Sequence, residues 1–328
     1  MATTPPRLVA ARKSVTATTL AAVGSALLVA LVAATPVGRR VAGSLLGREG
    51  KPALVLAVGD MSCGSSDRPR PISGPASVCA EKALSDEALA LRPDALLALG
   101  DTQYERGSLA DFKKFYDRSW GRLLPVTHPA VGNHEYGTSG ASGYFDYFGS
   151  AAGPRGKAYY SFNVGNWHLI ALNSECSKVG GCEENSPQHD WLLRDLDDND
   201  RDCILAYWHE PRFSSGRHGG STRYLPFWRA LMDVGADVVL TGHDHMYERF
   251  ARQDAEGRAD RDHGIREFVV GAGGRNRTQA RSPQPNSEVL DDGSYGFLEL
   301  SLRSSSYTWR YHALPPSTFA DSGSQSCH

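Results

Sequence analysis

Residues 95–104 read ALLALGDTQY, an apolar run that leads directly into glycine, aspartate and, three positions later, tyrosine. A short, fully apolar run between turn signals is typical of a strand that is buried on both faces. The same pattern occurs at Ala53–Val58 (ALVLAV), which is followed by Gly59-Asp60. The sequence therefore predicts two buried strands, each of which delivers a carboxylate at its carboxyl end.

Three later strands are predicted to end in the same way, with polar side chains of the metal-ligand type. They are a strand near Val126–Val131 that leads into Gly132-Asn133-His134-Glu135, Cys203–Trp208 that leads into His209, and Val238–Leu240 that leads into Thr241-Gly242-His243-Asp244-His245. Ligands bind beyond the carboxyl ends of the strands in open α/β sheets, so five such ends predict one shared crevice.

The rest of the chain alternates predicted helices with predicted strands. Helical spacing of apolar residues occurs at Cys79–Leu91, at Leu109–Tyr116, after Ser186-Pro187, and at Leu225–Val234. A hairpin that turns at Gly165-Asn166 is predicted for Tyr159–Val164 and Trp167–Leu172, and closing strands for Ile265–Val270, Tyr295–Leu302 and Tyr307–His312. This order predicts an α/β layered domain.

The composition is that of an ordinary globular protein, since 41% of the 328 residues are hydrophobic, 22% are charged and the formal net charge is -2. Nucleic-acid-binding proteins and membrane-surface proteins need a basic excess, which is absent here, so no nucleic-acid partner is expected. We expect a linker at 35–52, a single domain at 53–313 and a polar tail at 314–328.

The first 34 residues have the layout of an export signal. Arg7, Arg12 and Lys13 precede an uncharged run from Ser14 to Val37, and Val32-Ala33-Ala34 offers small residues for cleavage. The run is also nearly long enough to span a bilayer, so it is either a cleaved signal peptide or an N-terminal anchor. Both alternatives predict a secreted or extracellular protein, whose only membrane contact would be this segment.

Six cysteines agree with an oxidising compartment. Cys63 and Cys79 flank a Gly/Ser/Pro-rich stretch, and Cys176 and Cys182 bracket a five-residue loop, so we expect both pairs to form disulfides. Cys203 and Cys327 would then pair by exclusion. The alternative, a cysteine metal site, is disfavoured because the chain contains no Cys-x-x-Cys.

The residue types at the strand ends suit metal ions. Carboxylates and a phenolate favour a hard, highly charged cation such as Fe(III), while imidazoles favour divalent Zn, Fe or Mn. Two ions about 3.5 Å apart, bridged by one carboxylate, would activate a nucleophile and neutralise phosphoryl oxygens.

With these motifs, the sequence resembles the calcineurin-like metallophosphoesterases, specifically the purple acid phosphatase branch. That branch shows Asp-x-Gly, Gly-Asp-x-x-Tyr, Gly-Asn-His-(Asp/Glu), a lone His and Gly-His-x-His in this order. Here these read Asp60-Met61-Ser62, GDTQY, GNHE, AYWH and GHDH, and Met246-Tyr247-Glu248-Arg249 is also similar. The resemblance runs from Ala53 to His312 and implies a β-sandwich of two mixed sheets flanked by helices.

The resemblance also implies a set of metal ligands. The first metal, Fe(III), would take Asp60, Asp101, Tyr104 and His245. The second, Fe(II), Zn or Mn, would take Asp101, Asn133, His209 and His243, with Asp101 bridging. Ser62 departs from the pattern, because the branch has glycine there and other metallophosphoesterases have a metal-binding histidine, which serine replaces poorly.

Two further histidines match catalytic positions of the family. His134 follows Asn133, where the family's histidine contacts the substrate phosphate or the leaving group. His218 lies nine residues after His209, at the spacing of a catalytic histidine, and is the candidate general acid. The resemblance implies an exported acid phosphatase that acts on small-molecule phosphate esters or phosphorylated macromolecules by in-line attack of a metal-bound hydroxide.

Other interpretations stay open at this point. Asp60 or Asp101 alone is equally compatible with a helix N-cap, and the protein is alternatively a phosphodiesterase, another metal-dependent hydrolase or a non-catalytic extracellular metal-binding protein. The other histidines have no motif context, and the residues Gly271–Gly274 predict a tight turn near the rim of the site. Four aspartates on or just after one helix predict a solvated face: Asp190, Asp195, Asp197 and Asp198.

Overall fold

The computed structural model describes residues 51–64 and 79–328, which lie in one compact unit that extends from Arg48 to His328. The expected export segment at 1–34 and most of the expected linker at 35–52 lie outside the described residues. Within the described part, no helix has both the length and the apolar composition that crossing a bilayer would require.

The first sheet is mixed and contains the two buried strands predicted at Ala53–Val58 and Ala95–Leu99. Its strand order is β13-β12-β11-β1-β2-β3. β1 (Ala53–Val58), β2 (Ala95–Leu99) and β3 (Thr127–Ala130) run parallel, while β11 (Gly296–Leu302), β12 (Ser306–Ala313) and β13 (Ser322–Ser326) add antiparallel neighbours.

The second sheet is also mixed, with the order β10-β8-β9-β7-β6-β5-β4. Its parallel centre is β5 (Trp167–Ala171), β6 (Cys203–Tyr207), β7 (Val238–Thr241) and β9 (Arg266–Val270). The antiparallel flanks are β4 (Tyr160–Val164) on one side and β8 (Tyr247–Phe250) and β10 (Ser287–Asp291) on the other.

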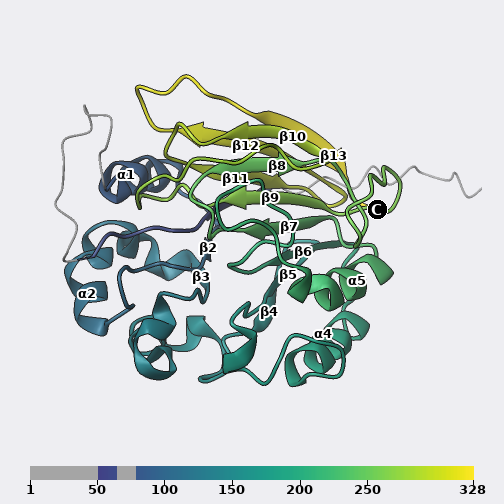
Figure 1. The fold of residues 1–328 in the computed structure, drawn as a ribbon, viewed down its shortest axis with the longest axis horizontal. Coiled ribbons are helices and arrows are strands. Elements are labelled where there is room, and N and C mark those ends of the chain that lie inside the picture. Colours follow the sequence, from purple (N-terminus) through teal and green to yellow (C-terminus); the bar gives the residue numbers. More distant parts are fainter. Residues whose placement is uncertain (1–50, 65–78) are drawn as a thin grey trace, which may run out of the picture. The chain divides into compact units, whose positions relative to one another are not determined.

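Alternation along each strand gives every sheet two buried faces. Val55, Leu97, Leu205 and Leu240 belong to one apolar cluster that joins the two sheets face to face. The residues between them in sequence face outward and are covered by helices: α1 (Glu81–Leu91), α2 (Leu109–Lys114) and α3 (Ser142–Phe148) on the first sheet, and α4 (Pro187–Asp197) and α5 (Leu225–Asp233) on the second (Figure 1). The predicted sandwich of two mixed sheets flanked by helices is therefore confirmed.

Local sequence signals explain most element ends. Ser186 caps α4 by accepting a hydrogen bond from His189 N, and Pro187 occupies the first turn, where its missing N–H costs nothing. The β4–β5 hairpin pairs Val164 with Trp167 across Gly165-Asn166, as predicted, and Gly165 takes a φ of 59°.

The helix α3 and the strands β8, β10 and β13 were not predicted from the sequence. The segment expected to be a polar tail, 314–328, carries β13, which pairs Gly323 with Trp309 of β12. The predicted solvated face of α4 is wrong at one position, because Asp195 turns toward β5 and lies 2.8 Å from His168 Nε2. A histidine that had no motif context thus binds an aspartate that was expected to be in water.

The three predicted disulfides, Cys63–Cys79, Cys176–Cys182 and Cys203–Cys327, are all present. Cys203 begins β6 and Cys327 follows β13, so this disulfide ties the second sheet to the edge strand of the first. A crosslink stabilises mainly by restricting the unfolded chain, and it does so more strongly when the loop it closes is longer.

We therefore expect the loss of Cys203–Cys327 to destabilise the fold more than the loss of Cys176–Cys182. The two disulfides close 124 and 6 residues, so chain entropy alone predicts a difference of about 3 kcal/mol in the free energy of unfolding. Paired Cys→Ser variants, unfolded in denaturant, measure both losses. An equal loss, or a larger loss for the short loop, would show that the inter-sheet crosslink does not act through the unfolded chain.

Candidate metal centre

The predicted ligand side chains follow strands of both sheets and meet at one edge of the sandwich. Asp60 follows β1, Asp101 follows β2 and His243 follows β7, and all three have left-handed backbones, with φ of 58°, 46° and 68°. Non-glycine residues rarely adopt this region, and such residues cluster at functional sites. The sharp turn after each strand directs the side chain back toward the other strand ends.

Two of the glycines that precede these ligands are required by close packing. A Cβ at Gly100 would lie 2.7 Å from the ring of His209, and a Cβ at Gly132 would lie 2.3 Å from Asp101 Oδ1. Both distances are below any real contact, so a side chain at either position would displace a ligand. The glycines of GDTQY and GNHE therefore keep the centre compact.

One group of side chains surrounds the phenol of Tyr104. Tyr104 Oη lies 2.8 Å from Asp60 Oδ1, 3.1 Å from Asp101 Oδ2 and 3.0 Å from His245 Nε2. His245 Nε2 is also 3.2 Å from Asp60 Oδ1. These are the four residues that the resemblance assigned to the first metal.

A second group surrounds His209, which is fully buried. His209 Nε2 lies 3.2 Å from Asn133 Oδ1, 3.2 Å from His243 Nδ1 and 3.2 Å from Asp101 Oδ2. Asp101 Oδ2 therefore belongs to both groups and is the atom where they meet. The structure thus brings all seven predicted ligands together, with Asp101 in contact with both groups.

The orientation of the imidazoles also fits cations. A backbone carbonyl accepts hydrogen bonds only, so His209 Nδ1 must donate to Leu99 O, at 2.9 Å, and His245 Nδ1 must donate to Asn276 O. Such bonds fix the ring and aim Nε2 at the centre, as is usual for metal-binding histidines.

The electrostatics require positive charge at the centre. Burial alone would raise the pKa of Asp101, but His209 and His134 lower it below its ordinary range. Burial lowers the pKa of His209 and His245, yet the carboxylates of Asp101 and Asp60 outweigh it and raise both values. The carboxylates of Asp60 and Asp101 thus favour either protonated forms of these two histidines or metal cations bound in place of the protons. The carboxylate oxygens suit a hard metal ion, and the imidazole nitrogens suit a borderline one.

His134 and His218 border the centre at different places. The ring of His134 lies 4.2 Å from that of Tyr104, and its Nε2 is 3.8 Å from Asp101 Oδ2. The ring of His218 lies 4.4 Å from that of His243 and is exposed to solvent. Ser62 is turned away from the group, with its hydroxyl 3.3 Å from Ser119 Oγ.

Two carboxylates inside the motifs have a positioning role that sequence reasoning missed. Glu135 is fully buried and accepts hydrogen bonds from Asp101 N, Gly132 N and Gln103 N, so it ties the turn after β2 to the turn after β3. Asp244 is fully buried and accepts hydrogen bonds from His218 N and Gly219 N. The only signal in the sequence was that both residues stand within two positions of a predicted ligand.

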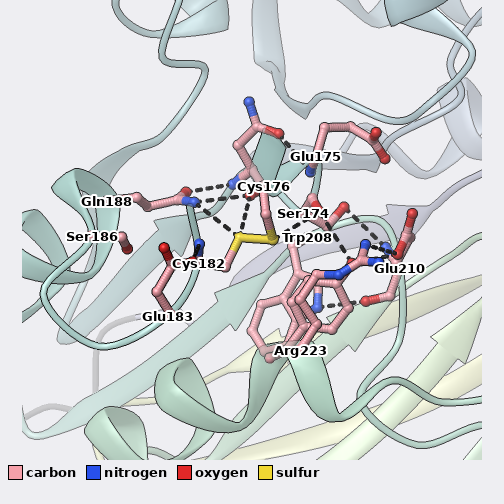
Figure 2. Close-up of a disulfide and its surroundings, with 12 residues drawn as sticks. Ser174, Glu175, Cys176, Cys182, Glu183, Ser186, Gln188, Trp208, Glu210 and Arg223 are labelled. Atoms are coloured by element: carbon pink, nitrogen blue, oxygen red, sulfur yellow. Dashed lines mark hydrogen bonds and ion pairs between the residues drawn. A yellow bond between two sulfur atoms is a disulfide. The ribbon is translucent and has the colours of Figure 1, made fainter. Parts of the chain in front are cut away.

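The residues on both sides of His209 are held by hydrogen bonds near the Cys176–Cys182 disulfide (Figure 2). Trp208 Nε1 donates to Glu210 O at 2.7 Å, and Glu210 N donates to Ser174 Oγ at 3.2 Å. The Glu210 carboxylate accepts from the hydroxyl of Tyr224. His209 is therefore positioned by the hydrogen bonds of its two neighbours as well as by its strand.

Comparisons with known proteins agree with the family resemblance that the motifs indicated. Residues 42–247 match the family model of the calcineurin-like phosphoesterases. Purple acid phosphatase 18 of Arabidopsis thaliana is 31% identical over 171 residues, which are 49% of this chain and 38% of that protein. Purple acid phosphatase 21 of the same plant is 27% identical over 255 residues, or 70% of this chain and 56% of that protein. This chain thus spans less than two thirds of either relative.

Solved structures share the fold at low sequence identity. A purple acid phosphatase from yellow lupin (Lupinus luteus) seeds superposes with a TM-score of 0.70 at 17% identity, over 84% of this chain and 53% of that one. GAP50, described as the anchor in the inner membrane complex of Plasmodium, superposes with a TM-score of 0.58 at 15% identity, over 85% of this chain and 90% of that one.

The position of Tyr104 leads to a spectroscopic prediction. Burial and the carboxylates of Asp101 and Asp60 raise the pKa of this phenol well above its ordinary value, whereas a bound ferric ion would reverse the sign and favour the phenolate. A phenolate on Fe(III) absorbs visible light by charge transfer, so iron-loaded protein should be coloured and iron-loaded Tyr104→Phe should not. A visible band in both proteins, or in neither at full iron content, would remove Tyr104 from the ligand set.

Proposed function

The chain belongs to the calcineurin-like phosphoesterase family, and on that basis we propose that it is an exported phosphatase that hydrolyses phosphate esters at a two-metal centre. The observation that carries the proposal is the shared position of Asp101 Oδ2, 3.1 Å from Tyr104 Oη and 3.2 Å from His209 Nε2. A carboxylate oxygen between two sets of donors is what a pair of ions requires.

Two ions would divide the ligands as the family resemblance implies. Fe(III) would be held by Asp60, Asp101, Tyr104 and His245, and Fe(II), Zn or Mn by Asp101, Asn133, His209 and His243. When bound, such ions supply Lewis acidity toward the phosphoryl oxygens and activate water. The hard oxygen donors of the first set and the imidazoles of the second favour this division.

His134 and His218 would then handle the substrate. His134 Nδ1 donates to Glu105 O at 2.6 Å, which leaves Nε2 to donate to a phosphoryl oxygen when it is protonated. His218, which borders the centre beside His243, would give its proton to the leaving oxygen as the P–O bond breaks. The electron pair of that bond stays with the leaving oxygen, and the product is a neutral alcohol.

One alternative is a non-catalytic extracellular metal-binding protein, and the fold is shared with GAP50, described as an anchor in the inner membrane complex of Plasmodium. Fold does not determine function, so the ligand set must decide. The complete set of seven donors, together with His134 and His218, favours an enzyme. A phosphodiesterase and other metal-dependent hydrolases are the remaining alternatives, and a panel of esters separates them.

Export is part of the proposal. Three disulfides favour an oxidising compartment, and the basic and then apolar segment at 1–34 provides the signal or the anchor. The substrates would be small phosphate esters or phosphorylated macromolecules outside the cell.

The role of His218 is tested by the dependence on the leaving group. A poor leaving group needs the proton of a general acid, whereas p-nitrophenolate departs without one, so His218→Ala should slow alkyl phosphates about 100-fold or more and p-nitrophenyl phosphate far less. His263→Ala, at an exposed histidine remote in sequence from every ligand, is the matched control.

Steady-state kcat on metal-replete protein measures both losses. Equal losses for the two esters would reduce His218 to phosphate binding. Absence of turnover by wild-type protein that binds two ions would instead favour the non-catalytic alternative.

A further inference from the structure

A cavity of about 340 Å³ lies next to His218, outside the set of predicted metal ligands. Its walls come from the loop after β6, with Arg212, Phe213, Ser214 and His218, and from the segment before β10, with Arg281 and Gln284; glycine backbone completes it. Pockets that bind small molecules begin at about 300 Å³, so the size suits one small organic group.

The two walls are joined by hydrogen bonds that backbone N–H groups of one wall donate to Ser215 of the other. Arg281 N donates to Ser215 O and Gln284 N donates to Ser215 Oγ, both at 2.7 Å. Ser215 is itself held by Glu248, which accepts from its backbone N at 2.7 Å. The two walls are therefore held together by bonds that do not use the side chain of Arg281.

The cavity is lined by cationic side chains and by no carboxylate. The side chain of Arg281 is exposed and makes no hydrogen bond or ion pair with any residue of 51–64 or 79–328. Arg212 is only 8% exposed, and its Nε has no hydrogen-bond partner among the same residues. A buried guanidinium with an unused N–H favours an anion nearby.

Glu267 is near Arg212 and attracts its charge, but no carboxylate of residues 51–64 or 79–328 forms a hydrogen bond or ion pair with the Arg212 guanidinium. Glu267 accepts from Arg212 N at 3.1 Å and from Phe213 N at 2.9 Å, and burial raises its pKa to about 8. Asp244 is occupied by the backbone N–H groups of His218 and Gly219.

The cavity also lies beside the residue that would protonate the leaving oxygen in the proposed reaction. His218 lines the cavity while its ring lies 4.4 Å from the ring of His243. If His218 protonates the leaving oxygen, the remainder of the alcohol must extend away from the metal centre on the side of His218. The cavity provides that space, with the aromatic ring of Phe213 as an apolar wall.

We propose that this cavity binds the alcohol part of the substrate and selects phosphate esters whose alcohol carries a second anionic group, which Arg281 contacts directly. The inference rests on the proposed phosphatase function and adds a substrate class to it. The second anion is a carboxylate or a further phosphate, since a guanidinium binds both through charge-assisted hydrogen bonds. Arg212 contributes positive potential from the buried wall.

The test compares two alkyl phosphates that differ only in the second group. In glycerol 2-phosphate the neighbour of the ester carbon is a hydroxymethyl group, and in glycerate 2-phosphate one such neighbour is a carboxylate. Wild-type protein should prefer the carboxylate ester in kcat/KM by about tenfold or more, because hydrogen bonds to charged groups are the strong ones. Arg281→Gln should remove most of that preference by raising KM for glycerate 2-phosphate much more than KM for glycerol 2-phosphate.

Arg217→Gln is the matched control, because Arg217 is an exposed cation of the same loop that does not line the cavity. A matched bisphosphate tests the other anion, and a preference for it alone would assign the site to phosphate. The proposal is overturned if wild-type kcat/KM is equal for the two glycerol-derived esters and no higher for the bisphosphate. An equal loss with every ester in Arg281→Gln, or the same effect of Arg217→Gln, would also overturn it.

A binding measurement separates this inference from the proposed function. If neither ester is hydrolysed, the phosphatase proposal fails, but calorimetry with glycerate 2-phosphate still examines the cavity. Tighter binding to wild type than to Arg281→Gln would support an anion site. Identical affinity of the two proteins would refute it.

Discussion

The centre depends on one constraint. Two carboxylates and a phenol are almost completely removed from water, so positively charged groups must lie close to them. Asp60 is 0% exposed, Asp101 1% and Tyr104 2%, and Glu135 is buried directly behind them. Burying carboxylates without compensation costs several kcal/mol for each ion. The imidazoles of His209 and His245 meet part of that requirement, and two cations that share Asp101 Oδ2 would meet it fully. The turns after β1, β2 and β7, with their left-handed residues, are the structural consequence, because only such turns bring the donors to one point.

Within the motifs, the ligands alternate with residues that hold them in place. Glu135 joins the turns that carry Asp101 and Asn133, and Asp244, which stands between two ligands, fixes the loop of His218. Each carboxylate accepts backbone N–H groups from a segment distant in sequence, so the segments that carry the proposed metal ligands and His218 are joined by hydrogen bonds. The same principle extends to the cavity, where Glu267 and Glu248 hold the loop wall by accepting hydrogen bonds from the backbone N–H groups of Arg212 and Ser215. Rigid placement of this kind is what a site needs if its ligands are to hold fixed positions.

The sequence predicted what is local and missed what depends on distant pairing. Apolar runs that end in Gly-Asp or Gly-Asn identified β1, β2 and the crevice, since period and turn chemistry are encoded within a few residues. β13 reads SGSQS and pairs only with β12, so its polarity gave no strand signal. Asp195 was assigned to solvent because its partner, His168, is 27 residues away. The bracing roles of Glu135 and Asp244 were equally hidden, because the groups that they bind lie in other loops.

The central claim is that Asp101 is shared by two metal ions, and the metal content of Asp101→Asn tests it most directly. An amide cannot provide the bridging negative charge, so the variant should lose both ions under conditions in which wild type retains two, with its circular dichroism unchanged. Asp198→Asn, at an exposed position of the polar segment after α4, is the control and should retain both ions. Two ions per chain together with full turnover in Asp101→Asn would contradict the account.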